Sequence, residues 1–163
     1  MKNQKSLTNK GFSLVELIIV VAIMAILIGV LAPQYLRYVE KSRLQKDNTS
    51  IGEIANVLKM AGAEETVINE LNAASGGIQY TFDATTGVLQ VPGTGATNLN
   101  AELEKTITPA DVKLTSSTYG KAATGYPVIL VTVDSNSIVT VTASGWIDAP
   151  GATPTTVAAP KKF

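Results

Sequence analysis

Glu16 is the residue whose type and position most clearly call for a chemical partner. It lies in the apolar run of residues 12–32, FSLVELIIVVAIMAILIGVLA, in which Ser13 is the only other polar side chain. A carboxylate in a membrane-spanning helix costs roughly 2.5–3.5 kcal/mol, so such residues usually have a partner. The run contains no Lys or Arg, so the partner charge must come from elsewhere.

A free α-amine at Phe12 would supply that charge at nearly the right place. Cutting the chain after Gly11 would create this amine four residues before Glu16. The spacing allows an ion pair within one chain, and the amine of a neighbouring chain is equally available. Phe12 and Glu16 are therefore the candidate charge pair of this sequence.

The segment that carries these residues is long enough to cross a membrane. As a helix that rises about 1.5 Å per residue, the twenty-one residues 12–32 span about 31 Å, close to the thickness of a bilayer's hydrocarbon core. The preceding residues 1–10 contain three lysines and no acidic residue, as expected on the cytoplasmic side of a membrane. The sequence predicts a membrane-inserting helix.

Three other interpretations of this segment remain open. A cleavable secretory signal would be cut before Pro33, but proline is poorly tolerated there and the apolar run exceeds the usual 7–15-residue core. An ordinary membrane anchor explains the length and leaves Glu16 unexplained. A buried core helix would be unusual after such a basic leader.

The composition excludes most enzyme classes. Without cysteine there is no disulfide, thiolate metal site or cysteine nucleophile, and without histidine the commonest general base and metal ligand are missing. The 13 basic and 13 acidic residues give a net charge of zero, which argues against binding driven by nucleic-acid phosphates. We expect no catalytic, cofactor-binding or metal site, no specific nucleic-acid partner and no enzymatic activity.

Three short motifs have simpler explanations than a binding site. Residues 93–95 (GTG) lack the spacing of a phosphate-binding loop and are interpreted as a turn. Asp134 and Asn136 could bind calcium, but a hairpin needs such residues anyway. Asn48 begins an N-x-S/T glycosylation pattern, which bacterial chains often carry without use.

Residues 10–17, KGFSLVEL, with the apolar run and Pro33 that follow, resemble the class III signal of type IV prepilins and the related pseudopilins. The resemblance covers residues 1–45. It implies that a membrane-embedded prepilin peptidase cuts between Gly11 and Phe12 and methylates the new amine of Phe12. It also implies that Glu16 pairs with the amine of an adjacent subunit during filament assembly.

The sequence departs from this family at one position. Many members have a glycine at the position of Ala25, whereas this chain has Gly29. Pro33 has no N–H for the carbonyl of Gly29, and its ring clashes with that carbonyl. Glycine is also a poor helix former. The pair predicts where the helix kinks or, as in related pili, melts inside the filament.

Beyond Pro33 the sequence predicts an α+β fold, in which a long N-terminal helix packs on a small antiparallel sheet. One helix is expected from Phe12 to about Met60, with an apolar stripe at the helical spacing of residues 51, 54, 55 and 58. The expected segments are a leader (1–11), a membrane or filament-core helix (12–33), an amphipathic helical region (34–75), a sheet domain (76–148) and a flexible Ala/Thr/Pro-rich tail (149–163).

Basic residues follow the apolar run. They are Arg37, Lys41, Arg43 and Lys46, partly balanced by Glu40 and Asp47. They are expected to form either a solvated face or a face that lines a filament.

The sheet domain is expected to contain two hairpins. Further expected elements are a short second helix (64–74), strands 78–83 and 88–91 around a turn at 84–87, a helix (101–107) capped by Asn100, a weak strand (112–115), and strands 127–133 and 137–143.

Together these features predict a type IV pilin, held first in the cytoplasmic membrane and then polymerised with other pilin subunits into a surface filament for adhesion or motility. The resemblance implies an assembly ATPase and a platform membrane protein as further partners. The alternatives are a pseudopilin of a type II secretion or DNA-uptake system, a membrane-anchored binding domain, and, more distantly, a secreted enzyme.

Overall fold

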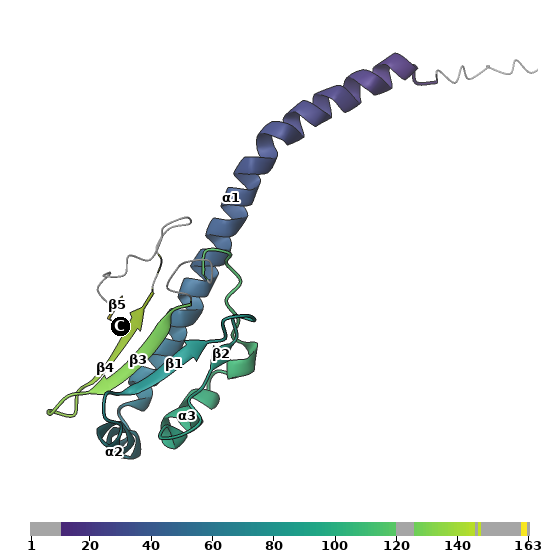
Figure 1. Cartoon of the computed structure of the whole chain (residues 1–163). Coiled ribbons are helices and arrows are strands. Elements are labelled where there is room, and N and C mark those ends of the chain that lie inside the picture. The colour runs from purple at the N-terminus through teal and green to yellow at the C-terminus, as the bar shows by residue number, and fades with distance from the viewer. Residues whose placement is uncertain (1–10, 120–125, 146, 148–160, 163) are drawn as a thin grey trace, which may run out of the picture. The chain divides into compact units, whose positions relative to one another are not determined.

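The computed structural model describes residues 11–119, 126–145, 147 and 161–162 (Figure 1). Residues 1–38 and 39–163 form two compact units. The elements are α1 (Leu14–Ala61), α2 (Glu65–Ala73), β1 (Ile78–Phe82), β2 (Leu89–Gln90), α3 (Thr97–Glu104), a 3-10 turn η1 (Pro109–Asp111), β3 (Val128–Val133), β4 (Val139–Ser144) and β5 (Lys161–Lys162). The predicted α+β class, with its long N-terminal helix and antiparallel sheet, is confirmed.

Helix α1 contains 48 residues, and Pro33 lies inside it. It ends where predicted, because the N–H groups of Ala63 and Glu64 bond back three residues, to Met60 and Ala61, and tighten the last turn. Gly62 allows this end to pack closely on the sheet, since a Cβ atom there would lie 2.7 Å from the Val139 side chain.

The second half of α1 shares one hydrophobic core with the sheet. Its buried side chains recur at helical spacing (Leu44, Ile51, Ile54, Ala55, Leu58), which confirms the predicted stripe. The antiparallel sheet has the order β2-β1-β3-β4-β5. In β1 the burial alternates, so Ile78, Tyr80 and Phe82 face the core. Opposite them in register, Ile129 and Val131 of β3 are also buried.

The predicted start of the third helix is wrong. Helix α3 begins at Thr97, four residues before the expected 101, and Asn100 does not cap it. Its first N–H groups instead donate to the carboxylate of Glu70 in α2, from Asn98 at 3.1 Å and from Leu99 at 2.9 Å. Asn100 accepts a hydrogen bond from the Tyr80 hydroxyl and donates one to the carbonyl of Pro92.

Two further expectations need correction. The weak strand expected at 112–115 is a single bridge between Val88 and Lys113, reinforced by backbone bonds from Leu89 and Leu114. The tail was expected to lack structure, but β5 pairs antiparallel with Thr142 and Ala143 of β4. The rest of that tail, 149–160 and 163, lies outside the described residues.

Candidate assembly site

The first turn of α1 is closed by a reciprocal pair of side chains. The hydroxyl of Ser13, just before the helix, accepts a 3.3 Å hydrogen bond from the N–H of Val15. The carboxylate of Glu16 accepts a 2.9 Å bond from the N–H of Ser13. This is a capping box, with the negative charge at the positive end of the helix dipole. The S-x-x-E spacing before an apolar run signals this box, although the sequence interpretation assigned Glu16 only a partner amine.

Gly11 and Phe12 lie immediately outside the helix. Both are exposed, they have no regular secondary structure, and the Phe12 side chain is 89 % exposed. A peptide bond in such a segment is open to a peptidase, whereas a bond inside a helix is not. The predicted processing site thus lies next to the capping box, because Phe12 directly precedes Ser13, whose N–H donates to Glu16. The leader itself, 1–10, lies outside the described residues.

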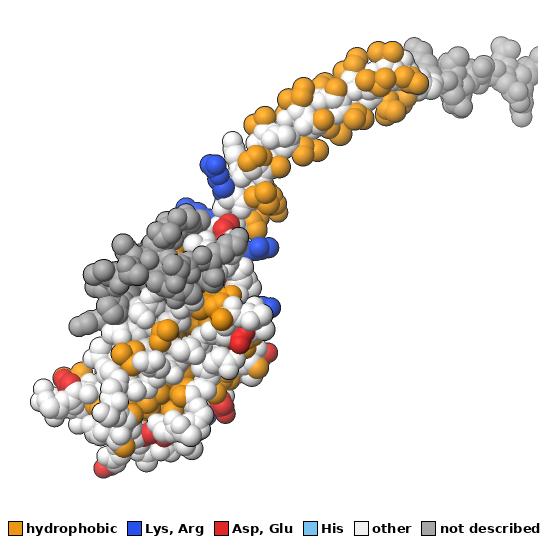
Figure 2. Space-filling model, viewed as in Figure 1, with side chains coloured by type: hydrophobic (Ala, Val, Ile, Leu, Met, Phe, Trp, Pro, Cys, Tyr) orange, Lys and Arg blue, Asp and Glu red, His pale blue; other side chains and the backbone are white. Residues whose placement is uncertain are grey.

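The helix that follows has an entirely exposed apolar surface. Every large apolar side chain from Phe12 to Leu36 is exposed, from 44 % at Val20 to 89 % at Phe12. Figure 2 shows hydrophobic side chains over this whole stretch of the helix. By length and composition the segment is able to cross a membrane, a test that a signal sequence near the N-terminus also passes. A surface of this kind needs lipid or other protein chains to cover it.

Gly29 and Pro33 lie in this exposed half of α1. The helix continues through both residues, and no atom lies within 4 Å of a Cβ placed on Gly29. Gly29 is therefore not required by packing against the described residues. Pro33 still leaves the Gly29 carbonyl without its helical donor.

The second half of α1 holds a loop of the sheet domain through two carboxylates that the sequence interpretation treated only as charge balance. Asp47, 1 % exposed, accepts bonds from the N–H groups of Thr115 at 2.8 Å and Ser116 at 2.6 Å. Glu40 accepts bonds from the hydroxyl of Ser116 at 2.6 Å and from the N–H and hydroxyl of Thr118 at 3.0 Å.

These hydrogen bonds lower the pKa of Glu40. Burial raises the pKa of its carboxyl, but the donors from Ser116, Thr118 and Ser117 outweigh burial and lower the pKa below the ordinary value. Glu40 therefore stays ionised and serves as an acceptor for the loop. No local sequence pattern predicts this role, because the donors lie 76 and 78 residues away.

The motifs that sequence analysis set aside serve the fold. The amide of Asn48 donates to the carbonyl of Ile147 at 3.0 Å and accepts a bond from the Tyr119 hydroxyl. Its nitrogen is therefore engaged within the domain. The carboxylate of Asp134 accepts 2.8 Å bonds from the N–H groups of Asn136 and Ile138, as expected for a hairpin turn.

Comparison with known proteins gives concordant results. Residues 6–32 match the family described as the prokaryotic N-terminal methylation motif. A type IV major fimbrial protein FimA of Dichelobacter nodosus is 35 % identical over 124 residues, which cover 70 % of this chain and 74 % of the relative. A second FimA of the same organism is 32 % identical over 123 residues, which cover 70 % and 72 %. No solved structure gives a significant match.

The similarity to the two FimA proteins shows the family. Together with a long apolar N-terminal helix that continues into a sheet domain, it shows that the chain belongs to the type IV pilin family.

Proposed function

We propose that this pilin is a structural subunit, not an enzyme, and the main building block of a type IV pilus. In this proposal the chain is made as a precursor in the cytoplasmic membrane and cut between Gly11 and Phe12. It is then methylated on the Phe12 amine and polymerised into a surface filament. The observation that carries the proposal is an exposed apolar helix with a single carboxylate in its first turn.

Assembly exchanges one apolar environment for another. Lipid tails are as apolar as leucine side chains, so helix packing in the filament can match what the helix loses on leaving the bilayer. The charge of Glu16 favours the filament over the bilayer. In the uncut chain it accepts the Ser13 N–H, and in the filament it gains the positive amine of Phe12 on a neighbouring subunit.

Further parts of the proposal rest on the family. Both relatives are named major fimbrial proteins, which favours the abundant subunit of a pilus over a pseudopilin. A prepilin peptidase, an assembly ATPase and a platform protein would act on the chain, and the finished filament would serve adhesion or motility. The segment from Gly29 to Pro33 would loosen inside the filament, since one helical hydrogen bond is already missing there.

Three variants separate the two roles of Glu16. Glu16→Gln keeps an acceptor oxygen for the capping box but removes the charge, Glu16→Ala removes both, and Ser13→Ala removes only the hydroxyl of the box. If the charge pair drives assembly, Glu16→Gln and Glu16→Ala lose most filaments while the chain is still cut, and Ser13→Ala keeps them. The readout is the amount of pilin in sheared surface material relative to membranes.

Normal filaments from Glu16→Gln would contradict the charge pair and assign Glu16 to the capping box alone. A chain that is processed but stays in the membrane fraction of wild-type cells would favour a pseudopilin.

A further inference from the structure

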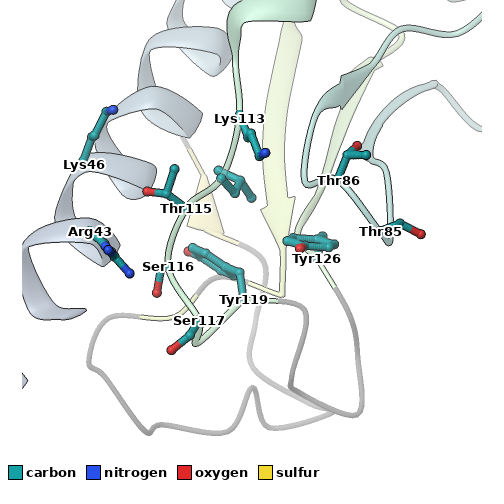
Figure 3. A pocket seen from close by; sticks show the side chains of 11 residues that line it. Arg43, Lys46, Thr85, Thr86, Lys113, Thr115, Ser116, Ser117, Tyr119 and Tyr126 are labelled. Atoms are coloured by element: carbon teal, nitrogen blue, oxygen red, sulfur yellow. The ribbon is translucent and has the colours of Figure 1, made fainter. Parts of the chain in front are cut away.

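The sheet domain contains a polar cavity between the second half of α1 and the β1–β2 turn. Its volume is about 780 Å³. Figure 3 shows Arg43 and Lys46 on the α1 side, Thr85 and Thr86 on the turn, and the segment from Lys113 to Ser117 between them. Cavities that hold small ligands have volumes of about 300–1,000 Å³, so this one has room for one.

The walls of the cavity are fixed by hydrogen bonds on both sides. Asp47 of α1 holds the backbone of Thr115 and Ser116. On the other side the Leu114 N–H donates to the Gly87 carbonyl at 3.0 Å. Gly87 has a φ of +72°, and a Cβ atom there would lie 2.8 Å from the Leu114 carbonyl oxygen, so glycine is required for this approach. These contacts position the wall segments at residues 115–116 and at Gly87 without a ligand.

The cavity has an excess of positive charge. Arg43, Lys46 and Lys113 all line it and all are exposed. No Asp or Glu is among its described lining residues, and none of the three cations has an ion-pair partner in the described part of the chain. The carboxylates of Asp47, Glu40 and Asp83 do not line the cavity, and they accept hydrogen bonds from its wall residues Thr115, Ser116 and Thr86. Three unpaired cations around one concave site attract an anion.

Hydroxyl groups complete the lining. Thr86 and Thr115 each donate a hydrogen bond to a carboxylate, Asp83 and Asp47 respectively. Each hydroxyl oxygen keeps acceptor lone pairs, which suit a ligand that carries hydroxyl donors. Tyr126 adds a half-buried aromatic ring. Cations, hydroxyl oxygens and an aromatic ring together suit a sugar that also carries acidic groups.

We propose that this cavity binds acidic polysaccharide, through one or two sugar units that carry a carboxylate or sulfate group. The proposal goes beyond the filament subunit role and does not depend on it. A nucleic acid is less suited. The net charge of the chain is zero, and the cavity offers no row of exposed aromatic rings on which bases would stack.

The test measures binding to the full-length protein in detergent micelles. The probes are a heparin tetrasaccharide, a galacturonate tetrasaccharide, a neutral maltotetraose and a single-stranded oligonucleotide. The variants are Arg43→Gln, Lys46→Gln, Lys113→Gln and the triple variant. Lys105→Gln is the control for a surface charge elsewhere, because Lys105 is exposed, does not line the cavity and pairs with Glu102. We expect each single change to weaken binding of an acidic tetrasaccharide about threefold, and the triple change about thirtyfold.

A second measurement uses the unaltered protein, so it does not depend on the folding of a variant. The acidic tetrasaccharide is expected to protect Lys46 and Lys113 from acetylation, as read by mass spectrometry, and to leave Lys105 unprotected. Equal binding by wild type and the triple variant, or equal labelling with and without ligand, would overturn the proposal. Binding of the oligonucleotide with no binding of either acidic sugar would overturn it in favour of a nucleic acid.

Discussion

The two halves of α1 belong to one helix and have opposite surfaces. From Phe12 to Leu36 every large apolar side chain is exposed, whereas Leu44, Ile51, Ile54 and Leu58 in the second half are at most 1 % exposed. The second half has an apolar stripe that matches its own sheet. The first half is apolar all round and is not covered by any other described residue of the chain.

Because of this difference, we expect the second half of α1 to govern the stability of the sheet domain and the first half to govern assembly. Substitutions in the second half should change the free energy of unfolding of the sheet domain, because that half forms part of its core. Substitutions in the first half should leave this free energy nearly unchanged and alter what the chain does in lipid or with other copies.

A matched pair of leucines tests the contrast directly. Leu58→Ala removes a fully buried side chain and should lower the free energy of unfolding by about 3 kcal/mol, from lost transfer energy and the cavity left behind. Leu27→Ala, at a residue 55 % exposed, should change it by less than about 0.5 kcal/mol. Denaturant unfolding of the full-length protein in detergent measures both. Similar losses for the two variants would show that the halves are not independent.

Removing the hydrogen bonds between α1 and the loop at 115–118 should have the next largest effect on the free energy of unfolding. Asp47→Ala leaves the N–H groups of Thr115 and of the buried Ser116 without an acceptor and should cost about 2 kcal/mol. Asp47→Asn keeps one oxygen and should cost less. Protection of the Thr115 and Ser116 amides from hydrogen exchange should fall in Asp47→Ala. Unchanged protection would mean that the loop is held by other contacts.

The smallest effect is a pH dependence. The pKa of Glu40 is lowered in the folded protein by its hydroxyl and N–H donors. Its stabilising contribution is therefore present above the ordinary value of 4.5 and lost as pH falls through the lower folded pKa. Because the group is partly solvated, we expect less than about 1 kcal/mol between pH 6 and 3. Glu40→Gln should flatten the unfolding profile over that range, and an unchanged profile would remove Glu40 as its cause.

How well the sequence predicts each part depends on how far apart the interacting residues lie. The stripe of Ile51, Ile54 and Leu58 is local, so its helical spacing predicted the buried face and the end of α1. The start of α3 depends on Glu70 in another helix, and so it was misplaced. The loop contacts of Asp47 join residues 68 and 69 positions apart. No local sequence pattern predicts these contacts.

The candidate site shows the same division. The apolar length, Gly11, Phe12 and Glu16 were all read from the sequence, because chain order alone brings them together. The S-x-x-E spacing of Ser13 and Glu16 is likewise a local signal, and it indicates the capping box. The cationic cavity was not predictable, because Lys113 lies 67 residues beyond Lys46 in the chain and meets it only through the fold.

Mass spectrometry of the chain's N-terminus, from sheared surface material and from membranes, tests the central claim most directly. We expect the surface form to begin at Phe12 with a methylated amine, because the exposed apolar half of α1 then carries a charge at its end that can meet Glu16 of a neighbour. A surface chain that begins at Met1, or at Pro33 after loss of the whole apolar half, would contradict the claim that this half forms the core of a filament.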